Sequence, residues 1–112
     1  TVVLNNIFFP PSKWTLSSDS KPELERVLQF MKDHPIIKVE IGGHTNDACS
    51  EEFCRKLSTN RSRAVYAYLI RRGVEENRVS FRGYGSKRPR YSNATPDGRR
   101  KNRRVEFKIV GV

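Results

Sequence analysis

The residues best suited to chemistry in this chain lie between an apolar run and a long periodic segment. A polar, glycine-rich loop at 42–46 follows the apolar run 36–41, and Arg61 stands further along, four residues after Leu57. That spacing puts Arg61 on the apolar stripe of a helix. Because a guanidinium keeps its proton and cannot be buried unpaired, we predict that Arg61 meets an anion.

Two sources of that anion are open. One is a carboxylate of the chain itself, which is the ordinary partner of a buried arginine. The other is a ligand held beside the loop. The chain has 12 acidic residues against 22 basic ones, and the inner face of the run 36–41 carries none. This shortage shifts the balance towards a ligand.

Two cysteines, Cys49 and Cys54, stand five residues apart beside the same loop. A disulfide between them would attach the loop to the helix, if their Cα atoms lie about 4.4–6.8 Å apart in an oxidising compartment. Two free thiols are the alternative. A zinc site with His44 lacks a fourth ligand, and a hydrolase using Cys54 and His44 lacks an orienting residue. We therefore expect no metal, no cofactor and no catalysis, with His44 holding the loop by hydrogen bonds.

Periodic apolar runs, separated by Pro, Gly and capping residues, define the elements. We expect strands over 2–9, 36–41, 79–81 and 105–109, and helices over 20–34 and 50–72. Ser20 and Glu23 have the spacing of a capping box, and Gly73 would end the second helix. The segment between 82 and 104 is rich in Gly and Pro and is expected to be a loop. The order β-α-β-α-β-loop-β predicts an α/β (α+β) two-layer sandwich, with a mixed sheet and both helices on one face.

The length of 112 residues predicts a single domain over 1–112, excised from a longer protein because the first residues already read as a strand. No stretch approaches the roughly 20 apolar residues of a membrane span, so we expect no membrane insertion by this domain. Any targeting or anchoring segment is expected upstream.

The formal net charge of +10 favours polyanions as partners. Nine basic residues and one acid, Asp97, lie between positions 82 and 104. This concentration is either a solubilising surface or a module that binds nucleic acid or another anionic polymer. Nucleic-acid readers commonly add stacking aromatics or a helix that enters a groove, and here the aromatics lie in a loop. We expect no nucleic acid as partner and keep the anionic-polymer binder as the alternative function.

Adjacent arginines precede the last expected strand. Since side chains alternate along a strand, Arg103 shares the inner face with Val105, whereas Arg104 faces the other way with Glu106. We expect one of the two arginines near the sheet end beside the loop and the other in solvent.

Short motifs in a fixed order carry a resemblance to a known family. They are Asn6-Ile7-Phe8-Phe9, Ile41-Gly42-Gly43-His44-Thr45, Leu57-Ser58 with Arg61, Gly83-Tyr84-Gly85, Pro89, Asn93-Ala94-Thr95, Gly98-Arg99 and Asn102-Arg103-Arg104-Val105-Glu106. With these motifs the chain resembles the OmpA-like C-terminal domain. That domain is the peptidoglycan-binding module of outer-membrane proteins, peptidoglycan-associated lipoproteins and flagellar stator proteins.

The resemblance implies a non-catalytic anchor on the periplasmic face of the outer membrane, which grips the diaminopimelate of a peptidoglycan stem peptide. It assigns the ligand carboxylate to Arg61 and the ligand ammonium to an aspartate after the His-Thr pair. A fork of N–H donors suits a carboxylate, and an acceptor-only group suits an ammonium. The ligand-binding residues expected on this basis are Thr45, Asn46, Asp47, Cys54, Leu57, Arg61 and Arg104. Gly43, His44 and Arg103 are expected to be structural.

The chain departs from the family pattern beside this site. Asn46 stands in place of the aspartate, and Asp47 is the nearest residue that could supply the missing charge. Cys54 replaces a usual asparagine that lines the site, Cys49 stands near a usual loop glycine, and Pro10 replaces a common acidic residue. These departures bear on the preference for diaminopimelate and leave the domain assignment intact.

Overall fold

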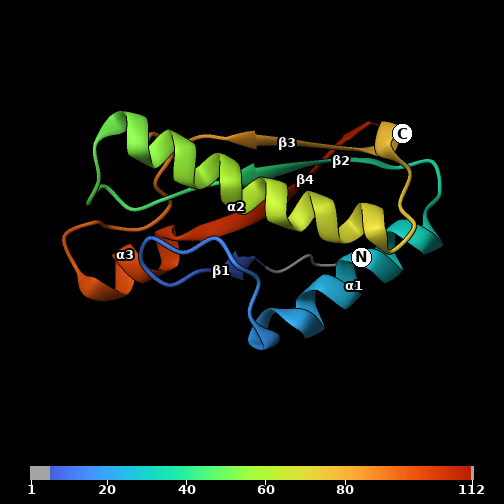
Figure 1. Ribbon diagram of the computed structural model, residues 1–112, viewed down its shortest axis with the longest axis horizontal. Helices are drawn as coiled ribbons and strands as arrows, with labels where there is room; N and C mark the ends of the chain where they lie inside the picture. Colours follow the sequence, from blue (N-terminus) through green and yellow to red (C-terminus); the bar gives the residue numbers. More distant parts are fainter. Residues whose placement is uncertain (1–5, 112) are drawn as a thin grey trace.

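A four-stranded mixed sheet organises the chain, which was analysed as a computed structural model describing residues 6–111 (Figure 1). The strands are β1 (Ile7–Phe8), β2 (Lys38–Gly43), β3 (Val79–Gly83) and β4 (Arg104–Gly111). The helices are α1 (Lys21–Asp33), α2 (Glu51–Arg71) and α3 (Pro96–Asn102), with 3-10 turns η1 (Ser18–Ser20) and η2 (Glu76–Arg78). The sheet order is β1-β4-β2-β3, in which β2 and β3 are parallel and the other pairs antiparallel.

One face of the sheet and the two long helices share a single core. Val39 and Ile41 of β2 and Val105 of β4 are buried on that face, as alternation along a strand requires. Helix α1 contributes Leu28 among others, and α2 contributes Val65. The expected two-layer sandwich with a mixed sheet is therefore confirmed. No helix within residues 6–111 is both long and apolar enough to cross a bilayer.

Helix α2 lies directly on the backbone of the sheet where β2 and β3 end (Figure 1). A Cβ built on Gly43 would lie 1.9 Å from the carbonyl oxygen of Ser58, and one on Gly83 would lie 2.2 Å from Thr59 Oγ1. Side chains at these two positions would push the helix away. The glycines thus bring α2 within contact of the strand ends, beside which the candidate site forms.

The described elements correct four expectations. The segment 82–104 contains helix α3, which begins at Pro96 directly after its N-cap Thr95, whose side chain accepts a hydrogen bond from Gly98 N. Ser20 makes no capping hydrogen bond, since it belongs to η1 and has helical backbone angles. Strand β2 begins at Lys38 rather than residue 36. Within the described residues the first strand is limited to β1, and positions 2–5 of the expected strand lie outside them.

Replacement of Gly43 by alanine is expected to destabilise the fold. The added methyl group would meet main-chain atoms of α2, which cannot rotate away, and overpacking costs roughly 1–3 kcal/mol. Urea unfolding of Gly43→Ala should show this loss. Gly111→Ala is the matched control, because its Cβ would come no closer than 3.7 Å to Lys38 Cδ. Equal stability of the two variants would contradict the close contact.

Candidate functional site

The loop over residues 44–50, here called the β2–α2 loop, is fixed at its start by main-chain hydrogen bonds. His44 N donates to the carbonyl of Arg104 at 2.9 Å, and Thr45 N donates to that of Gly85 at 3.0 Å. Asn46 then turns the chain, because its Oδ1 accepts the N–H of Ala48 at 3.0 Å. The loop is therefore tied both to the last strand and to the segment that follows β3.

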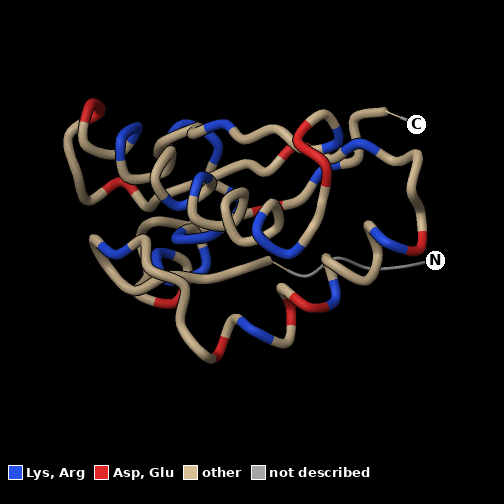
Figure 2. The backbone as a smooth tube through the Cα atoms, turned by 45° about the vertical axis from the view of Figure 1, so that its right-hand side comes forward, with Lys and Arg blue, Asp and Glu red and all other residues tan. Residues whose placement is uncertain are grey.

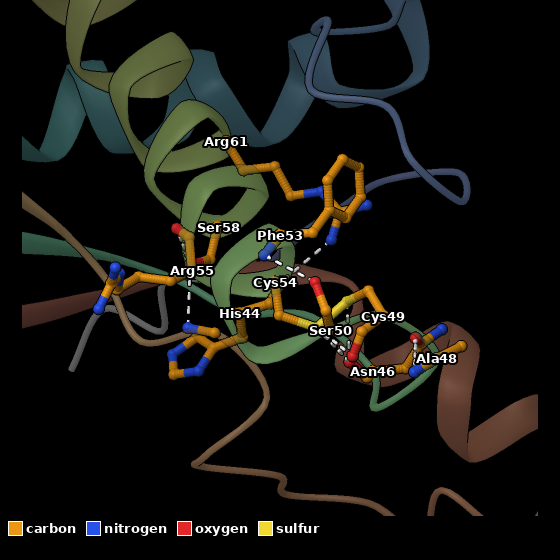
Figure 3. Close-up of a disulfide and its surroundings, with 11 residues drawn as sticks. His44, Asn46, Ala48, Cys49, Ser50, Phe53, Cys54, Arg55, Ser58 and Arg61 are labelled. Carbon is orange, nitrogen blue, oxygen red and sulfur yellow. Dashed lines mark hydrogen bonds between the residues drawn. A yellow bond between two sulfur atoms is a disulfide. The ribbon is translucent and has the colours of Figure 1, made fainter.

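A disulfide closes the other end of this loop (Figure 3). It joins Cys49 to Cys54, whose Cα atoms are 5.6 Å apart, so the disulfide alternative is confirmed and the free-thiol alternative is wrong. Ser50 caps α2 by accepting the N–H of Phe53 at 3.2 Å. The bond and the cap together attach the loop to the first turn of the helix. Within residues 6–111 no cluster of His, Cys, Asp and Glu is arranged to hold a metal ion.

Arg61 is completely buried, and its partners are neutral. Its Nε donates to the carbonyl oxygen of Lys13 at 2.8 Å, Nη1 to that of His44 at 3.1 Å and Nη2 to that of Pro10 at 3.0 Å. No carboxylate of residues 6–111 forms an ion pair with it. The internal-carboxylate alternative is therefore wrong, and the ligand alternative stays a prediction. Within the protein, main-chain oxygens accept three of its N–H groups.

The charge of Arg61 survives this burial. Desolvation, followed by the nearby positive charge of Arg103, lowers the pKa of Arg61 to about 10. At neutral pH the guanidinium is still protonated. Three of its five N–H groups are used by the carbonyls, which leaves one on each terminal nitrogen.

A small cavity of about 100 Å³ opens beside Arg61, between the β2–α2 loop, α2 and the turn at residues 10–13. We call it the ligand cavity. It is lined by Pro11, Ser12, Thr45, Asn46, Ala48, Cys49, Phe53, Leu57, Arg61 and Arg103. The lining contains two arginines and no acidic residue, so the cavity favours an anionic group. Its Thr45 hydroxyl is buried without a hydrogen-bond partner in the described structure.

The structure brings together most of the expected site residues and moves three away. Thr45, Asn46, Leu57 and Arg61 line the ligand cavity, and Cys54 is wholly buried outside the lining. Asp47 is exposed and does not line it. The remaining displaced residue is Arg104, which lines a different cavity.

Arg103 occupies the position at the ligand cavity for which Arg104 was expected. Helix α3 ends one residue before Arg103, whose half-buried side chain donates from Nε to the carbonyl of Phe9 at 3.0 Å. The alternation along the strand puts it on the same side as Val105. The alternation was visible in the sequence, but Arg104 was expected beside the site, and it is Arg103 that lines this cavity. The sequence also gave no sign of Phe53 or of Ser12, whose φ of 56° marks a tight turn.

Arg104 is buried on the outer face of the sheet. The expectation that one of the two arginines lies in solvent is therefore wrong, because Arg103 is half-buried as well. Its Nη2 donates to the carbonyl of Arg88 at 3.1 Å and pairs with Glu106 Oε1 at 3.2 Å. Together with His44 and Tyr84 it lines a second cavity of about 300 Å³. These bonds fold the basic segment back over the sheet.

The His44 ring also lies on this outer face, pointing away from the disulfide (Figure 3). It stacks on Tyr84 at 5.2 Å between ring centroids, and its Nε2 is 3.7 Å from Glu106 Oε1. Burial and the charge of Arg104 lower the pKa of His44 to about 4, although Glu106 acts in the opposite direction. The ring is therefore neutral at pH 7. The main chain of His44, rather than its ring, makes the hydrogen bonds that hold the loop.

An open mixed sheet covered by α2, with a basic cavity where β2 leads into α2, defines a small α/β sandwich domain with its candidate site at a strand–helix junction. By sequence the chain belongs to the OmpA family, which it matches over residues 8–103. The family expected from the motifs is therefore confirmed.

Relatives in sequence and a solved structure support this membership. Outer membrane protein A of Bordetella avium is 37% identical over 111 residues, which cover 98% of this chain and 57% of that protein. Peptidoglycan-binding protein ArfA of Mycobacterium tuberculosis is 43% identical over 86 residues, covering 77% of this chain and 26% of that protein. The C-terminal domain of Helicobacter pylori MotB superposes with a TM-score of 0.90 at 27% identity, covering 98% of this chain and 87% of that one. The chain thus spans little more than half the length of the Bordetella protein and about a quarter of the length of ArfA.

Removal of the disulfide is expected to lower the free energy of unfolding by about 2 kcal/mol, as for closure of a short loop. Urea unfolding of the double variant Cys49→Ser, Cys54→Ser would measure the loss. The free energy of unfolding of the reduced wild type should approach that of the variant, and reductant should not change the stability of the variant. Wild type that is unaffected by reductant would contradict the bond.

The stability of the domain should fall as pH decreases from 6.5 to 4, because the unfolded chain then protonates His44 while the folded chain does not. The full difference is on the order of 3 kcal/mol. His44→Gln should show a correspondingly flatter pH dependence in urea unfolding across that window. Identical slopes for the variant and wild type would show that His44 does not contribute.

Proposed function

We propose that this domain binds peptidoglycan without catalysing a reaction on it. In this proposal the ligand cavity takes the diaminopimelate residue of a stem peptide, and the domain anchors an envelope protein to the cell wall on the periplasmic side of the outer membrane. The observation that carries the proposal is the cavity itself, which is lined by Arg61 and Arg103 and by no acidic residue.

The relatives support the general binding activity. ArfA is named a peptidoglycan-binding protein, and the Bordetella relative is named an outer membrane protein. The same family match covers the part of this chain that contains every residue of the ligand cavity. These names support peptidoglycan as partner and the cell envelope as location.

Recognition of a carboxylate is supported by the donors left at the cavity. Arg61 keeps one N–H on each terminal nitrogen, and Arg103 uses only its Nε in bonding the protein. Two guanidinium groups beside one small cavity provide the forked donors that carboxylates prefer. Because Arg61 also binds three main-chain carbonyls from the turn 10–13 and the end of β2, its replacement would disturb the fold, and Arg103 is the better position for a test.

Recognition of the ammonium is weaker in this chain. Asn46 supplies a neutral amide oxygen that already accepts the N–H of Ala48, and Asp47 lies outside the lining. An aspartate at 46 could accept the same N–H and add a full negative charge. We therefore propose that the cavity retains diaminopimelate but binds it less tightly than an aspartate-containing site would.

Asn46→Asp is expected to tighten binding of free diaminopimelate by about 1 kcal/mol, roughly fivefold, because a hydrogen bond to a charged group is stronger than a neutral one. Arg103→Gln should weaken binding of the same ligand. Isothermal titration calorimetry would measure both, and sedimentation with insoluble peptidoglycan would test the polymer.

Pimelate provides the matched ligand control, because it keeps both carboxylates and lacks both ammonium groups. Asn46→Asp should not tighten the binding of pimelate. Asp47→Asn should leave the binding of diaminopimelate unchanged. Failure of wild type to sediment with peptidoglycan would refute the proposed function. Weaker diaminopimelate binding by Asn46→Asp would show that no ammonium lies beside residue 46.

A further inference from the structure

A cluster of exposed basic side chains lies on a surface distinct from the ligand cavity. Two adjoining hollows of about 530 and 250 Å³ run along the edge between α2 and β3 and share Arg55, Arg82 and Gly83. We call them the basic groove, after their exposed basic residues Arg55, Lys56, Arg63, Arg82, Lys87 and Arg88. Glu51 and Glu52 are the acids that line it.

The cations of the groove are mostly without acidic partners. Lys87 pairs with Glu51 at 2.6 Å, but in the part of the chain described here no carboxylate oxygen lies within 4 Å of the charged groups of the other five. Several basic residues at 90–104 differ, because acidic side chains of the protein pair with them. Arg100 and Lys101 pair with Asp97, and Arg90 pairs with Glu106.

The basic residues of the groove differ in part from those of the basic segment that the sequence emphasised. Figure 2 shows Lys and Arg spread over several elements rather than confined to one segment. The sequence drew attention to 82–104, but that segment supplies only half of the groove's six basic residues, and α2 supplies the other half.

The groove and the ligand cavity lie on different sides of α2. The cavity is lined by Phe53, Leu57 and Arg61, which recur every four residues. Arg63, which lines the groove, follows Arg61 by two residues, or roughly 200° around the helix. Binding in the groove therefore need not displace a ligand of the cavity.

The aromatic ring at the groove, that of Tyr84, already packs against side chains of the protein. Tyr84 stacks on His44, and the guanidinium carbons of Arg82 and Arg88 lie 5.1 and 4.2 Å from its centroid. Binding of single-stranded nucleic acid relies on bases stacking on free aromatic faces. The groove instead offers arginine forks, which suit phosphate and carboxylate groups.

We propose that the basic groove binds a flexible, linear polyanion, a chain of repeated phosphate or carboxylate groups, independently of the ligand cavity. Its length over two hollows suits an extended chain, and its charge supplies an affinity that depends on release of counterions from that chain. This surface goes beyond the proposed recognition of diaminopimelate and does not depend on it.

The test measures affinity for short inorganic polyphosphate and for poly-L-glutamate between about 50 and about 200 mM salt. For the double variant Arg55→Gln, Arg82→Gln the slope of log affinity against log salt should shrink by about 1.4, taking roughly 0.7 for each contact with a flexible strand. The control Lys21→Gln, Lys32→Gln removes the same charge from α1 and should keep the wild-type slope. Preference for one polymer would assign phosphate or carboxylate groups as the source.

Three results would contradict the proposed binding of a polyanion in the groove. They are an absence of binding to both polymers at low salt, an equal loss of slope in the groove and control variants, and tighter binding of an oligothymidylate than of polyphosphate with the same charge. Calorimetry of the groove variant with diaminopimelate separates this test from the proposed function, because that titration should be unchanged. Thermal melts of both double variants verify that they are folded.

Discussion

The fully buried guanidinium of Arg61 is the interaction on which the candidate site depends. It draws together the carbonyls of Pro10 and Lys13 from the N-terminal turn and of His44 from the end of β2, all from a position on α2. A guanidinium without hydrogen-bond acceptors at this depth would be strongly unfavourable, so the turn and the end of β2 are held against α2 at distances fixed by one rigid, planar group. The ligand cavity is the space that remains beside this junction. Its positive charge is therefore part of the architecture and not an addition to it.

The regular elements were readable from the sequence because each was specified locally. Alternation in β2 and the capped apolar stripe of α2 predicted both elements and the junction between them. Helix α3 was missed because Gly and Pro suggested a loop, although Thr95-Pro96-Asp97 also has the composition of a helix start. The cavity was predicted only in part, since its far wall comes from residues 10–13. Those residues are joined to it by tertiary hydrogen bonds that leave no local pattern.

Charge illustrates the same limit. The alternation of a strand separated Arg103 from Arg104, but it could not say which side of the sheet would hold the ligand cavity. Nor could a count of basic residues distinguish Arg104, which is buried against Glu106, from Arg82, which faces a groove. Which cations are available to a partner depends on where the few acids lie after folding. That distribution is a property of the tertiary structure.

The sheet order has a consequence for how the domain is completed. Strand β4 is the last strand within residues 6–111, yet it lies between β1 and β2, so the first and final described strands are direct neighbours. While the chain is being synthesised from its N-terminus, β1 lacks the strand with which it pairs in the described structure until β4 emerges. Pairings so distant in sequence form late, because closing a long loop costs entropy before any contact is gained. Delivery of the whole chain and assembly of the sheet are thus coupled, and a chain released before β4 would expose an unpaired strand edge.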